Sequence, residues 1–341
     1  MLRSNIEEHV KLVDSFGRNI DYIRISVTDR CNLRCVYCMP AKGVEYFDTA
    51  ELMTFEEILL FIKAASELGI KKIRITGGEP LMRKELPWLI ARIRQIPGIE
   101  DLSITTNGVY LEKDARSLAD SGLDRVNISL DTMRPDRYKN ITGGGGIDDV
   151  LRGIRAAEDA GLLPIKLNIV PLRGVNDDEI EDFARLSITT GYQVRFIELM
   201  PTRVNMAEST GKLSNVPISG MVSADEIKRY VEKIAPIYPV KLRRAGPARY
   251  YRFDGCEGVF GIISAVTCRF CQECNRLRLT AVGALKPCLY SDTQVDVKTM
   301  MRFGATKEEI KKLIIIGAEL KPQRHNIERE VSLDAMSIIG G

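Results

Sequence analysis

Three closely spaced cysteines are the residues of this chain best suited to chemistry. Cys31, Cys35 and Cys38 are separated by three and then by two residues, and no fourth cysteine follows them nearby. Three thiolates can hold three irons of a [4Fe–4S] cube, which leaves the fourth iron without a protein ligand. An open position of this kind lets a metal centre bind a molecule that carries an amine and a carboxylate. The alternatives are a zinc loop or three buried thiols.

A second group of cysteines lies far along the chain. Cys268, Cys271 and Cys274 are followed by Cys288 after a gap of thirteen residues, and Cys256 stands alone upstream. By spacing alone, the four grouped cysteines fit a closed four-thiolate site that holds zinc or an iron–sulfur cluster in a structural role. The spacing also fits a second cube held by Cys271, Cys274 and Cys288, with one open iron. Whether Cys256 or Cys268 contacts metal stays open at this point.

Composition and charge narrow the class of protein. The chain of 341 residues has a net charge of +3, so it carries no strong overall bias toward polyanions. Its eight cysteines are bunched at 31–38 and 256–288, which indicates metal ligation in a reducing compartment rather than disulfides. The first 18 residues lack a long apolar run, and no stretch is long enough to span a bilayer. We expect a cytoplasmic protein that binds neither nucleic acid nor membranes.

A regular alternation of strand and helix patterns predicts the elements that position these residues. Strand patterns occur at 21–28, 72–76, 102–106, 125–130, 164–170 and 193–199. Helical patterns occur at 54–68, 85–96, 111–121, 147–160, 177–190 and 225–234. Capping-box spacing is present at Thr54–Glu57 and at Asn176–Glu179. Strict alternation predicts parallel strands with helices outside, which is an α/β fold. The family resemblance described below further implies that these units form an incomplete (βα)6 TIM-type barrel.

The alternation stops at about residue 240 and divides the chain into two predicted regions. Residues 15–235 form the barrel, and residues 236–341 form a smaller α+β region that carries the second cysteine group. That region contains short strand patterns at 250–253, 259–263, 277–280 and 285–289. The polar, small residues at 205–224 are typical of a loop over the barrel mouth.

Polar residues at the ends of the predicted strands are candidates for a site, because chemistry in such barrels gathers at the carboxyl ends of the strands. The second strand ends at Gly77-Gly78-Glu79-Pro80, where glycines let the backbone approach a ligand closely. Thr105 ends the third strand, Ser129 and Asp131 end the fourth, and Met200 follows the sixth. Taken singly, each of these also fits an ordinary turn, helix cap or core position.

Cationic residues on the predicted strands suggest an anion site. Arg276 and Arg278 alternate on one strand, so both side chains point to the same face. Arg24 and Arg74 occupy the first two strands, and Lys166 lies between apolar neighbours in the fifth. Arginine gives bidentate, permanently charged contacts, which a triphosphate requires. Each arginine alone is more often a surface charge, but together they predict a cationic lining between the two cysteine groups.

The first cysteine group resembles the signature of radical S-adenosylmethionine (SAM) enzymes. The likeness covers residues 31–38, with Tyr37 just before the last cysteine, and Gly77-Gly78-Glu79-Pro80 downstream. It implies that a [4Fe–4S] cluster on the first three cysteines binds SAM and cleaves it to a 5′-deoxyadenosyl radical. The family positions that contact SAM match Tyr37, Gly78, Ser129 and Met200.

The second cysteine group resembles one family of radical SAM enzymes, the GTP 3′,8-cyclases of molybdenum cofactor biosynthesis. The likeness is carried by Phe270 to Thr280, by Cys288-Leu-Tyr and by the final Gly340-Gly341, which in that family form a flexible tail thought to reach the active site. It implies a second [4Fe–4S] cluster on Cys271, Cys274 and Cys288. It also implies GTP contacts, with Arg276 and Arg278 as catalytic residues and Leu277 acting through its backbone; the matching positions are Arg24, Arg74, Thr105, Lys166, Arg276, Leu277 and Arg278.

The resemblance further implies a reaction and its partners. The radical would abstract hydrogen from C3′ of GTP, C3′ would bond to C8, and a one-electron reduction would yield (8S)-3′,8-cyclo-7,8-dihydro-GTP. The expected partners are an electron donor of the flavodoxin or ferredoxin type, the cyclic pyranopterin monophosphate synthase that receives the product, and a second copy of the chain. The alternatives are a radical-SAM peptide-maturation or dehydrogenase enzyme with an auxiliary cluster, and a metal-stabilised nucleic-acid-binding protein.

Overall fold

The computed structural model describes residues 11–40, 43–201, 218–242, 246–325 and 336–339. Its strands form one sheet in the order β12-β11-β10-β1-β2-β3-β4-β5-β6-β9-β8-β7. The strands from β10 to β9 in this order run parallel, and the pairs outside them are antiparallel. The parallel strands are β10 (Arg276–Leu279), β1 (Tyr22–Ser26), β2 (Lys72–Thr76), β3 (Asp101–Thr106), β4 (Arg125–Ser129), β5 (Lys166–Ile169), β6 (Gln193–Ile197) and β9 (Val259–Ile263).

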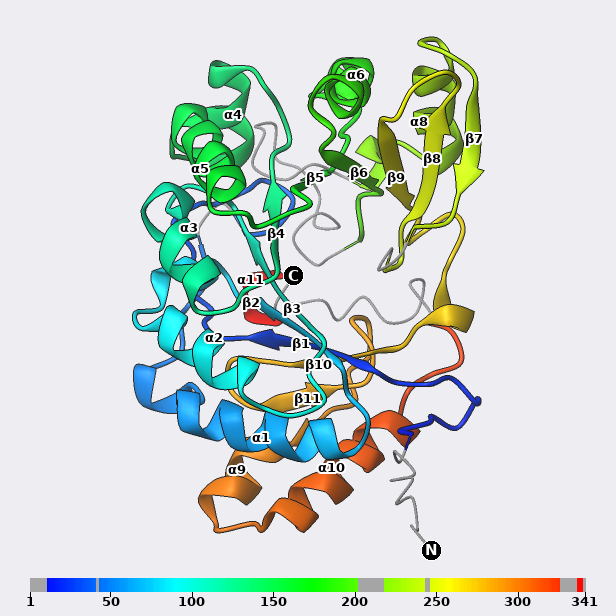
Figure 1. Ribbon diagram of the computed structural model, residues 1–341. Helices are drawn as coiled ribbons and strands as arrows, with labels where there is room; N and C mark the ends of the chain where they lie inside the picture. Colours follow the sequence, from blue (N-terminus) through cyan, green and yellow to red (C-terminus); the bar gives the residue numbers. More distant parts are fainter. Residues whose placement is uncertain (1–10, 41–42, 202–217, 243–245, 326–335, 340–341) are drawn as a thin grey trace, which may run out of the picture.

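Helices follow the strands and pack on the outer face of the curved sheet, as Figure 1 shows. The predicted helices are present as α1 (Phe55–Glu67), α2 (Leu86–Arg94), α3 (Leu111–Asp120), α5 (Ile147–Asp159), α6 (Ile180–Thr190) and α8 (Ala224–Glu232). The incomplete α/β barrel is therefore confirmed. Among the described residues between β1 and β6, α4 (Pro135–Thr142) was not predicted; it lies between β4 and α5, and Pro135 at its first position suits a helix start.

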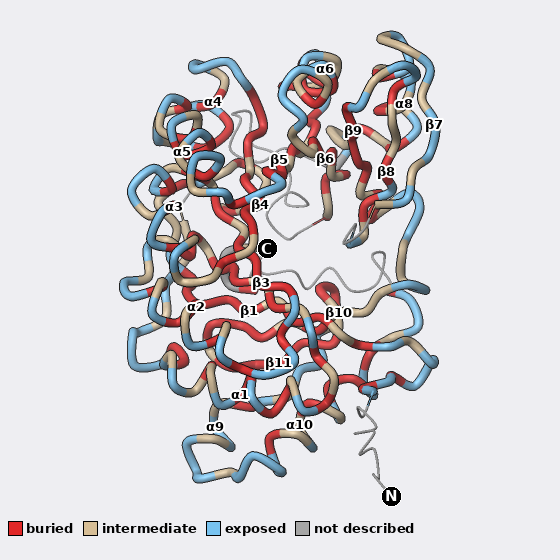
Figure 2. Tube along the Cα trace, viewed as in Figure 1, coloured by how far each residue is buried: buried red, intermediate tan, exposed pale blue. Residues whose placement is uncertain are grey.

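The hydrophobic core fills the space between the sheet and its helices. In α1, the residues Ile58, Phe61, Ile62 and Ala65 recur at helical spacing and are fully buried against the sheet. Figure 2 shows the same arrangement for the whole molecule, with buried strands inside and exposed helix faces outside. The predicted cap of α1 is present, because the backbone amide of Glu57 donates to Thr54 Oγ1 and the Glu57 carboxylate accepts from the Thr54 amide.

The strands of the C-terminal region extend the barrel sheet on both sides. β9 pairs with β6 at one end of the barrel, and β10 pairs with β1 at the other. β8 (Arg249–Phe253) and β7 (Ile237–Val240) continue beyond β9, while β11 (Ala284–Lys286) and β12 (Val295–Asp296) continue beyond β10. Among the described residues the sheet ends at β12 and β7, so it does not close.

The last helices tie the C-terminal region to the barrel. α9 (Val297–Arg302) and α10 (Lys307–Glu319) lie beside α1 on the outside, where Arg302 forms an ion pair with Glu57. The helical turn α11 (Met336–Ile339) instead lies inside the curve of the sheet (Figure 1). Gly340-Gly341 and most of the predicted loop at 205–224 fall outside the described residues.

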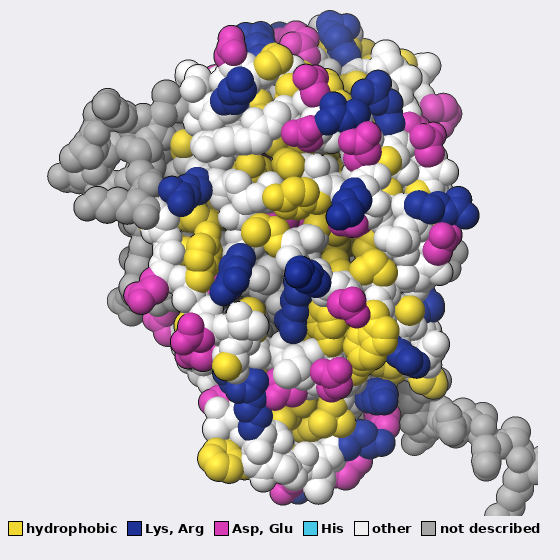
Figure 3. Space-filling view, turned by 90° about the vertical axis from the view of Figure 1, so that its left-hand side faces the viewer, with side chains coloured by type: hydrophobic (Ala, Val, Ile, Leu, Met, Phe, Trp, Pro, Cys, Tyr) yellow, Lys and Arg dark blue, Asp and Glu magenta, His cyan; other side chains and the backbone are white. Residues whose placement is uncertain are grey.

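The surface carries a mixture of charges. On the face drawn in Figure 3, Lys and Arg side chains are interspersed with Asp and Glu side chains and with small hydrophobic areas. This distribution agrees with the net charge of +3. In the described part of the chain, every helix is too short or too polar to cross a bilayer.

Candidate active site

One cavity brings the two cysteine groups together inside the curve of the sheet. It has a volume of about 300 Å³, and its walls come from residues more than two hundred positions apart in sequence. The cysteines that line it are the two predicted trios: Cys31, Cys35 and Cys38, and Cys271, Cys274 and Cys288. Cys268 is exposed and Cys256 packs against the main hydrophobic core, so neither lines the cavity.

The first cysteine loop follows β1 and is fixed by main-chain hydrogen bonds to the end of α4. The amide of Arg34 donates to Thr142 O at 2.7 Å, and the amide of Val36 donates to Ile141 O at 2.9 Å. Burial, followed by the negative charges of Cys38 and Asp131, raises the pKa of the Cys35 thiol well above its usual range. Thiols that repel one another on one wall fit a cationic iron cluster, which would neutralise their charges.

The glycines of the Gly-Gly-Glu-Pro turn are required by the cysteine loop. A Cβ on Gly78 would lie 2.3 Å from Arg30 O, and one on Gly77 would lie 2.6 Å from Thr28 O. The amide of Gly78 donates to Thr28 O at 2.8 Å. Both glycines also line the cavity. The sequence indicated that these glycines let the backbone approach a ligand closely. In the structure, their backbone closely approaches the backbone of residues 28–30.

Glu79 and Asn107 connect this turn to the first cysteine. The buried carboxylate of Glu79 accepts from Thr106 Oγ1 at 2.7 Å and from the Asn107 amide at 2.7 Å. Burial raises the pKa of Glu79 to about 7. The Asn107 side chain donates to Asn32 Oδ1 at 2.8 Å and reaches Cys31 Sγ at 3.9 Å. Asn107 was missed as a site residue, because an Asn-Gly pair after a strand is typical of a turn.

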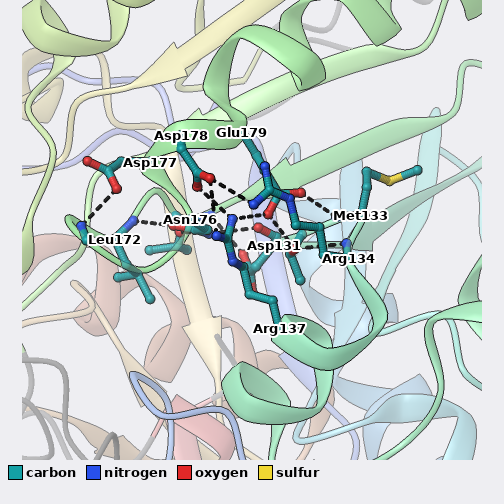
Figure 4. A network of polar contacts seen from close by, with 12 residues as sticks. Asp131, Met133, Arg134, Arg137, Leu172, Asn176, Asp177, Asp178 and Glu179 are labelled. Carbon is teal, nitrogen blue, oxygen red and sulfur yellow. Dashed lines mark hydrogen bonds and ion pairs between the residues drawn. The ribbon is translucent and has the colours of Figure 1, made fainter.

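Tyr37 is held by a polar network that begins at the end of β4. Its hydroxyl donates to Asp131 Oδ2 at 2.6 Å, and Asp131 Oδ1 accepts from the Val170 amide at 2.8 Å. Burial raises the pKa of Asp131 to about 6, although these two hydrogen bonds act against the shift. The Asn176 side chain donates to Asp131 O at 2.7 Å and to Val170 O at 3.1 Å, which holds the loop after β5 against the loop after β4 (Figure 4).

The predicted capping box at Asn176 and Glu179 is wrong. Asn176 makes no side-chain cap; its Oδ1 accepts from the Leu172 amide at 2.6 Å. Glu179 accepts from Thr132 Oγ1 at 2.6 Å and pairs with Arg137 (Figure 4). Both side chains form hydrogen bonds with the loop after β4 instead of capping their own helix, because polar side chains near a helix start can bond to tertiary partners in place of the helix backbone.

Arginines form a row across three neighbouring strands. Arg278 on β10 lies in register with Arg24 on β1, and Arg24 lies in register with Arg74 on β2. These three and Arg276 line the cavity. Burial and then the charge of Arg276 lower the pKa of Arg278 to about 10, and burial and then the charge of Arg278 lower the pKa of Arg24. The row therefore favours an anion that offsets its mutual repulsion.

Lys166 lies on β5 inside the barrel, although it is not part of the cavity wall. Burial, and then the positive charges of Arg195 and Arg125, lower the pKa of Lys166 to about 6. Arg195 was missed by sequence analysis; it lines the cavity and donates to Asn127 Oδ1 at 2.7 Å. The sequence feature that could have identified Arg195 is the same as for Lys166: a charged residue between apolar neighbours within a strand.

The remaining predicted residues line the same cavity, apart from Leu277. Thr105, Ser129 and Met200 belong to the wall, whereas the buried side chain of Leu277 packs in the core. Thr105 Oγ1 and Asn168 Oδ1 are buried without a hydrogen-bond partner in the described part of the chain. Two such orphaned oxygens facing a cavity fit a polar ligand, because burying them unpaired costs free energy.

The second trio lies on the cavity wall around β10 and β11, with Cys271 and Cys274 before β10 and Cys288 after β11. Although burial opposes it, the charges of Arg276 and Lys321 lower the pKa of Cys274 to about 6. Across the described ranges, no three His, Cys, Asp or Glu side chains gather closely enough to hold a single metal ion. Cys268 is exposed and does not line the cavity with the other three cysteines. Three thiolates of a cube each bind a different iron and so lie farther apart than the ligands of one ion.

The last described turn of the chain, α11, contacts the first cysteine loop. The amide of Met336 in α11 donates to Cys38 O at 3.1 Å, and Met336 lines the cavity. Ile339 is buried against Leu289 and Tyr290, next to Cys288. α11 therefore lies between the two trios, and nothing in its short sequence indicated this position.

The fold and the first cysteine loop define the class of protein. A radical SAM superfamily model matches residues 25–187, and a Molybdenum Cofactor Synthesis C model matches residues 192–327. The structure of SuiB from Streptococcus suis bound to S-adenosylmethionine is similar, with a TM-score of 0.60 and 13% identity over 93% of this chain and 79% of that chain. At this identity the likeness shows the fold alone. A partial barrel whose first strand leads into the three-cysteine loop is that of a radical SAM enzyme.

Relatives with known names narrow this class. A protein named GTP 3′,8-cyclase from Thermodesulfovibrio yellowstonii is 48% identical over 330 residues, which cover 96% of this chain and 99% of that protein. Proteins of the same name from Pelotomaculum thermopropionicum and Moorella thermoacetica are 46% and 47% identical over 330 residues, with the same coverage. The chain belongs to the GTP 3′,8-cyclase family. Membership in the radical SAM superfamily implies one [4Fe–4S] cluster and SAM binding.

Proposed function

We propose that this chain is a GTP 3′,8-cyclase that converts GTP to (8S)-3′,8-cyclo-7,8-dihydro-GTP in the first step of molybdenum cofactor biosynthesis. The observation that carries the proposal is the single cavity lined by both cysteine trios and by the arginine row. A cavity lined by several arginines suits a nucleoside triphosphate better than a peptide chain, which favours this reaction over peptide maturation.

The first trio, Cys31, Cys35 and Cys38, holds a [4Fe–4S] cluster at the carboxyl end of β1. When bound there with SAM, this cluster supplies the electron that releases the 5′-deoxyadenosyl radical, which takes hydrogen from C3′ of GTP. The chain's own part is to hold SAM in place with Tyr37, Gly78, Ser129 and Met200, all of which line the cavity. The hydrogen bond from Tyr37 to Asp131 fixes the tyrosine ring against this wall.

The arginine row binds the triphosphate and orients the ribose. Arg24, Arg74, Arg276 and Arg278 place permanent charges on one wall, and Thr105 offers a hydroxyl beside them. Lys166 gains its proton when the phosphate charge arrives, and the Leu277 backbone completes the contact. Cys271, Cys274 and Cys288 would hold a second [4Fe–4S] cluster, and the iron that these three thiolates leave without a protein ligand would be available to the guanine. Fixing the substrate and excluding water matter because a primary carbon radical attacks most groups within reach.

The proposal extends to partners that family membership supports. A flavodoxin or ferredoxin provides two electrons, one to cleave SAM and one to reduce the cyclised guanine radical. The product passes to cyclic pyranopterin monophosphate synthase, and the enzyme acts in the cytoplasm as a homodimer.

The decisive experiment is anaerobic incubation of the iron-loaded protein with GTP, SAM and dithionite, with product detection by mass spectrometry. We expect 5′-deoxyadenosine together with a cyclised nucleotide that has the same mass as GTP, because C3′ loses one hydrogen atom and the final one-electron reduction with one proton adds one. The product is therefore separated from GTP by chromatography before its mass is measured. Formation of 5′-deoxyadenosine without any GTP-derived product, in protein with about eight irons per chain, would contradict the proposed substrate.

A further inference from the structure

Lys321 is a buried lysine directly after α10, and its ammonium group reaches the second cysteine trio. Its side chain is almost wholly inaccessible to solvent, and it lines the cavity. The Nζ atom donates to Arg276 O at 2.8 Å and to Pro287 O at 2.9 Å. Burying an ammonium is costly unless its protons are bonded, so this position is built for a cation.

The two carbonyl groups lie next to two cysteines of the trio. Arg276 is two residues after Cys274, and Pro287 immediately precedes Cys288. One side chain therefore joins the two chain segments that carry these cysteines, although β10 and β11 separate them in sequence. The third ammonium proton is available to Cys274, because a side-chain hydrogen bond and the charge of Lys321 both act on its thiol.

A second cation secures the remaining cysteine to the same segment. Arg18 donates to Cys271 O at 2.6 Å and to Pro322 O at 2.7 Å, and its guanidinium is fixed by an ion pair with the buried Asp14 at 2.5 Å. Residues 321–322 thus contact the backbone around all three cysteines, directly through Lys321 and indirectly through Arg18. Lys321 and Arg18 make these contacts to main-chain oxygens. The contacts therefore require the two cationic side chains but do not depend on the side chains of the residues that carry the oxygens.

We propose that Lys321 is the positioning residue of the second cluster and that it also sets the cluster's reduction potential. This inference rests on the proposed second cluster on Cys271, Cys274 and Cys288. The bonds to Arg276 O and Pro287 O hold the ligand segments at the separation that a cube needs. A fixed positive charge beside a thiolate ligand stabilises the reduced, more negative cluster, so it raises the reduction potential. Lys321 contacts no reacting atom and acts through Cys274.

The test uses the full-length chain with Cys31, Cys35 and Cys38 changed to alanine, so that any iron signal comes from the second cluster. In this background, reconstituted protein should hold about four irons. Lys321→Gln keeps hydrogen-bond donors without the charge, Lys321→Arg keeps the charge, and Lys321→Met removes both. Lys312→Met, on the exposed side of α10, is the matched control. Iron content and a redox titration followed by electron paramagnetic resonance are measured for each.

We expect Lys321→Gln to keep its iron but to show a lower reduction potential than the background protein. Lys321→Arg should keep a potential close to that of the background protein, and Lys321→Met should lose at least half of its iron. Lys312→Met should change neither quantity. If Lys321→Gln and Lys321→Met fail to fold, Lys321→Arg still tests the proposal. A lower reduction potential in Lys321→Arg, which keeps the positive charge, would contradict the claim that this charge sets the potential.

The outcomes separate the inference from the proposal on which it rests. If the background protein binds about four irons and neither iron content nor potential responds to loss of Lys321, the inference is wrong and the second cluster stands. If the background protein binds no iron although it is folded, the second cluster itself is wrong, and the inference falls with it.

Discussion

Arg24 on β1 lies directly in register with Arg278 on β10, although the two residues belong to opposite ends of the chain. Both side chains line one wall of the cavity, and burial and then the charge of Arg278 lower the pKa of Arg24. A protein that places like charges side by side in its interior gives up stability unless a ligand compensates. The pair therefore connects the fold of the C-terminal region with recognition of an anionic substrate.

Replacing one of these arginines should lower the rate of GTP conversion but leave the rate of SAM cleavage almost unchanged. We expect Arg278→Ala to lower kcat/KM for GTP by about 100-fold, because a hydrogen bond to a charged group contributes about 1.5–3 kcal/mol. Uncoupled formation of 5′-deoxyadenosine should stay within about twofold, since Arg278 lies on β10 near Cys274 and Cys288 and is not part of the first cysteine loop. Both rates are measured anaerobically by chromatography, with the exposed Arg116→Ala as control. An equal loss of both rates in folded, iron-loaded protein would contradict this role.

GTP binding should be coupled to proton uptake at Lys166. Its pKa is lowered from 10.5 to about 6, so the side chain is mostly neutral in the free enzyme at pH 7.5. An approaching triphosphate favours the charged form and raises this pKa, so affinity for GTP should fall as the pH rises above about 6. Calorimetric titrations in buffers of different ionisation enthalpy report the uptake directly. Lys166→Met should abolish it, and unchanged uptake in that variant would assign the proton to another group.

The pKa of Lys166 also affects stability in the protein without ligand. Between pH 6 and 10.5 the unfolded chain holds a proton that folded Lys166 lacks. The free energy of unfolding should therefore rise with pH in this window, and the slope should be smaller in Lys166→Met. Urea unfolding at several pH values measures the slope.

Glu79 should contribute both to stability and to its pH dependence. Glu79→Ala leaves the Thr106 hydroxyl and the Asn107 amide unpaired, and we expect a loss of about 2–4 kcal/mol in the free energy of unfolding. Folded Glu79 keeps a proton between pH 4.5 and 7 that the unfolded chain releases, so its contribution falls as the pH rises through this window. Urea unfolding of Glu79→Gln should show a weaker decline. The exposed Glu112→Ala should cost under about 1 kcal/mol, and a similar loss in both alanine variants would refute the special role of Glu79.

The glycine turn should be needed for the first cluster. In Gly78→Ala the new Cβ would meet Arg30 O at 2.3 Å, so the cysteine loop must move. We expect the variant to lose about 1–3 kcal/mol of stability and to bind fewer irons on reconstitution. Gly144→Ala is the matched control, because its added Cβ meets no atom within 4 Å. Iron assays and urea unfolding compare the two, and full iron loading of Gly78→Ala would show that the loop tolerates displacement.

Local patterns in the sequence determined the barrel strands, most of the barrel helices and the spacing of the cysteines in each group. The cap of α1 at Thr54 and the spacing of Cys31, Cys35 and Cys38 depend on residues a few positions apart, and such neighbours interact in the same way in most folds. Arg276 and Arg278 were predicted to share a face for the same reason, since side chains alternate along a strand.

The tertiary structure alone decided which distant residues meet. Sequence periodicity does not specify that β10 joins the edge beside β1, because strand pairing depends on packing of the whole sheet. This pairing places Arg278 beside Arg24. Glu179 forms its hydrogen bond and ion pair with Thr132 and Arg137 and not with the predicted helix cap. Lys321 donates hydrogen bonds to the carbonyl groups of Arg276 and Pro287, which lie near Cys274 and Cys288. The sequence determined that this protein has two groups of cysteines and a set of arginines on its strands, and long-range packing decided that both cysteine trios and several of these arginines line one cavity.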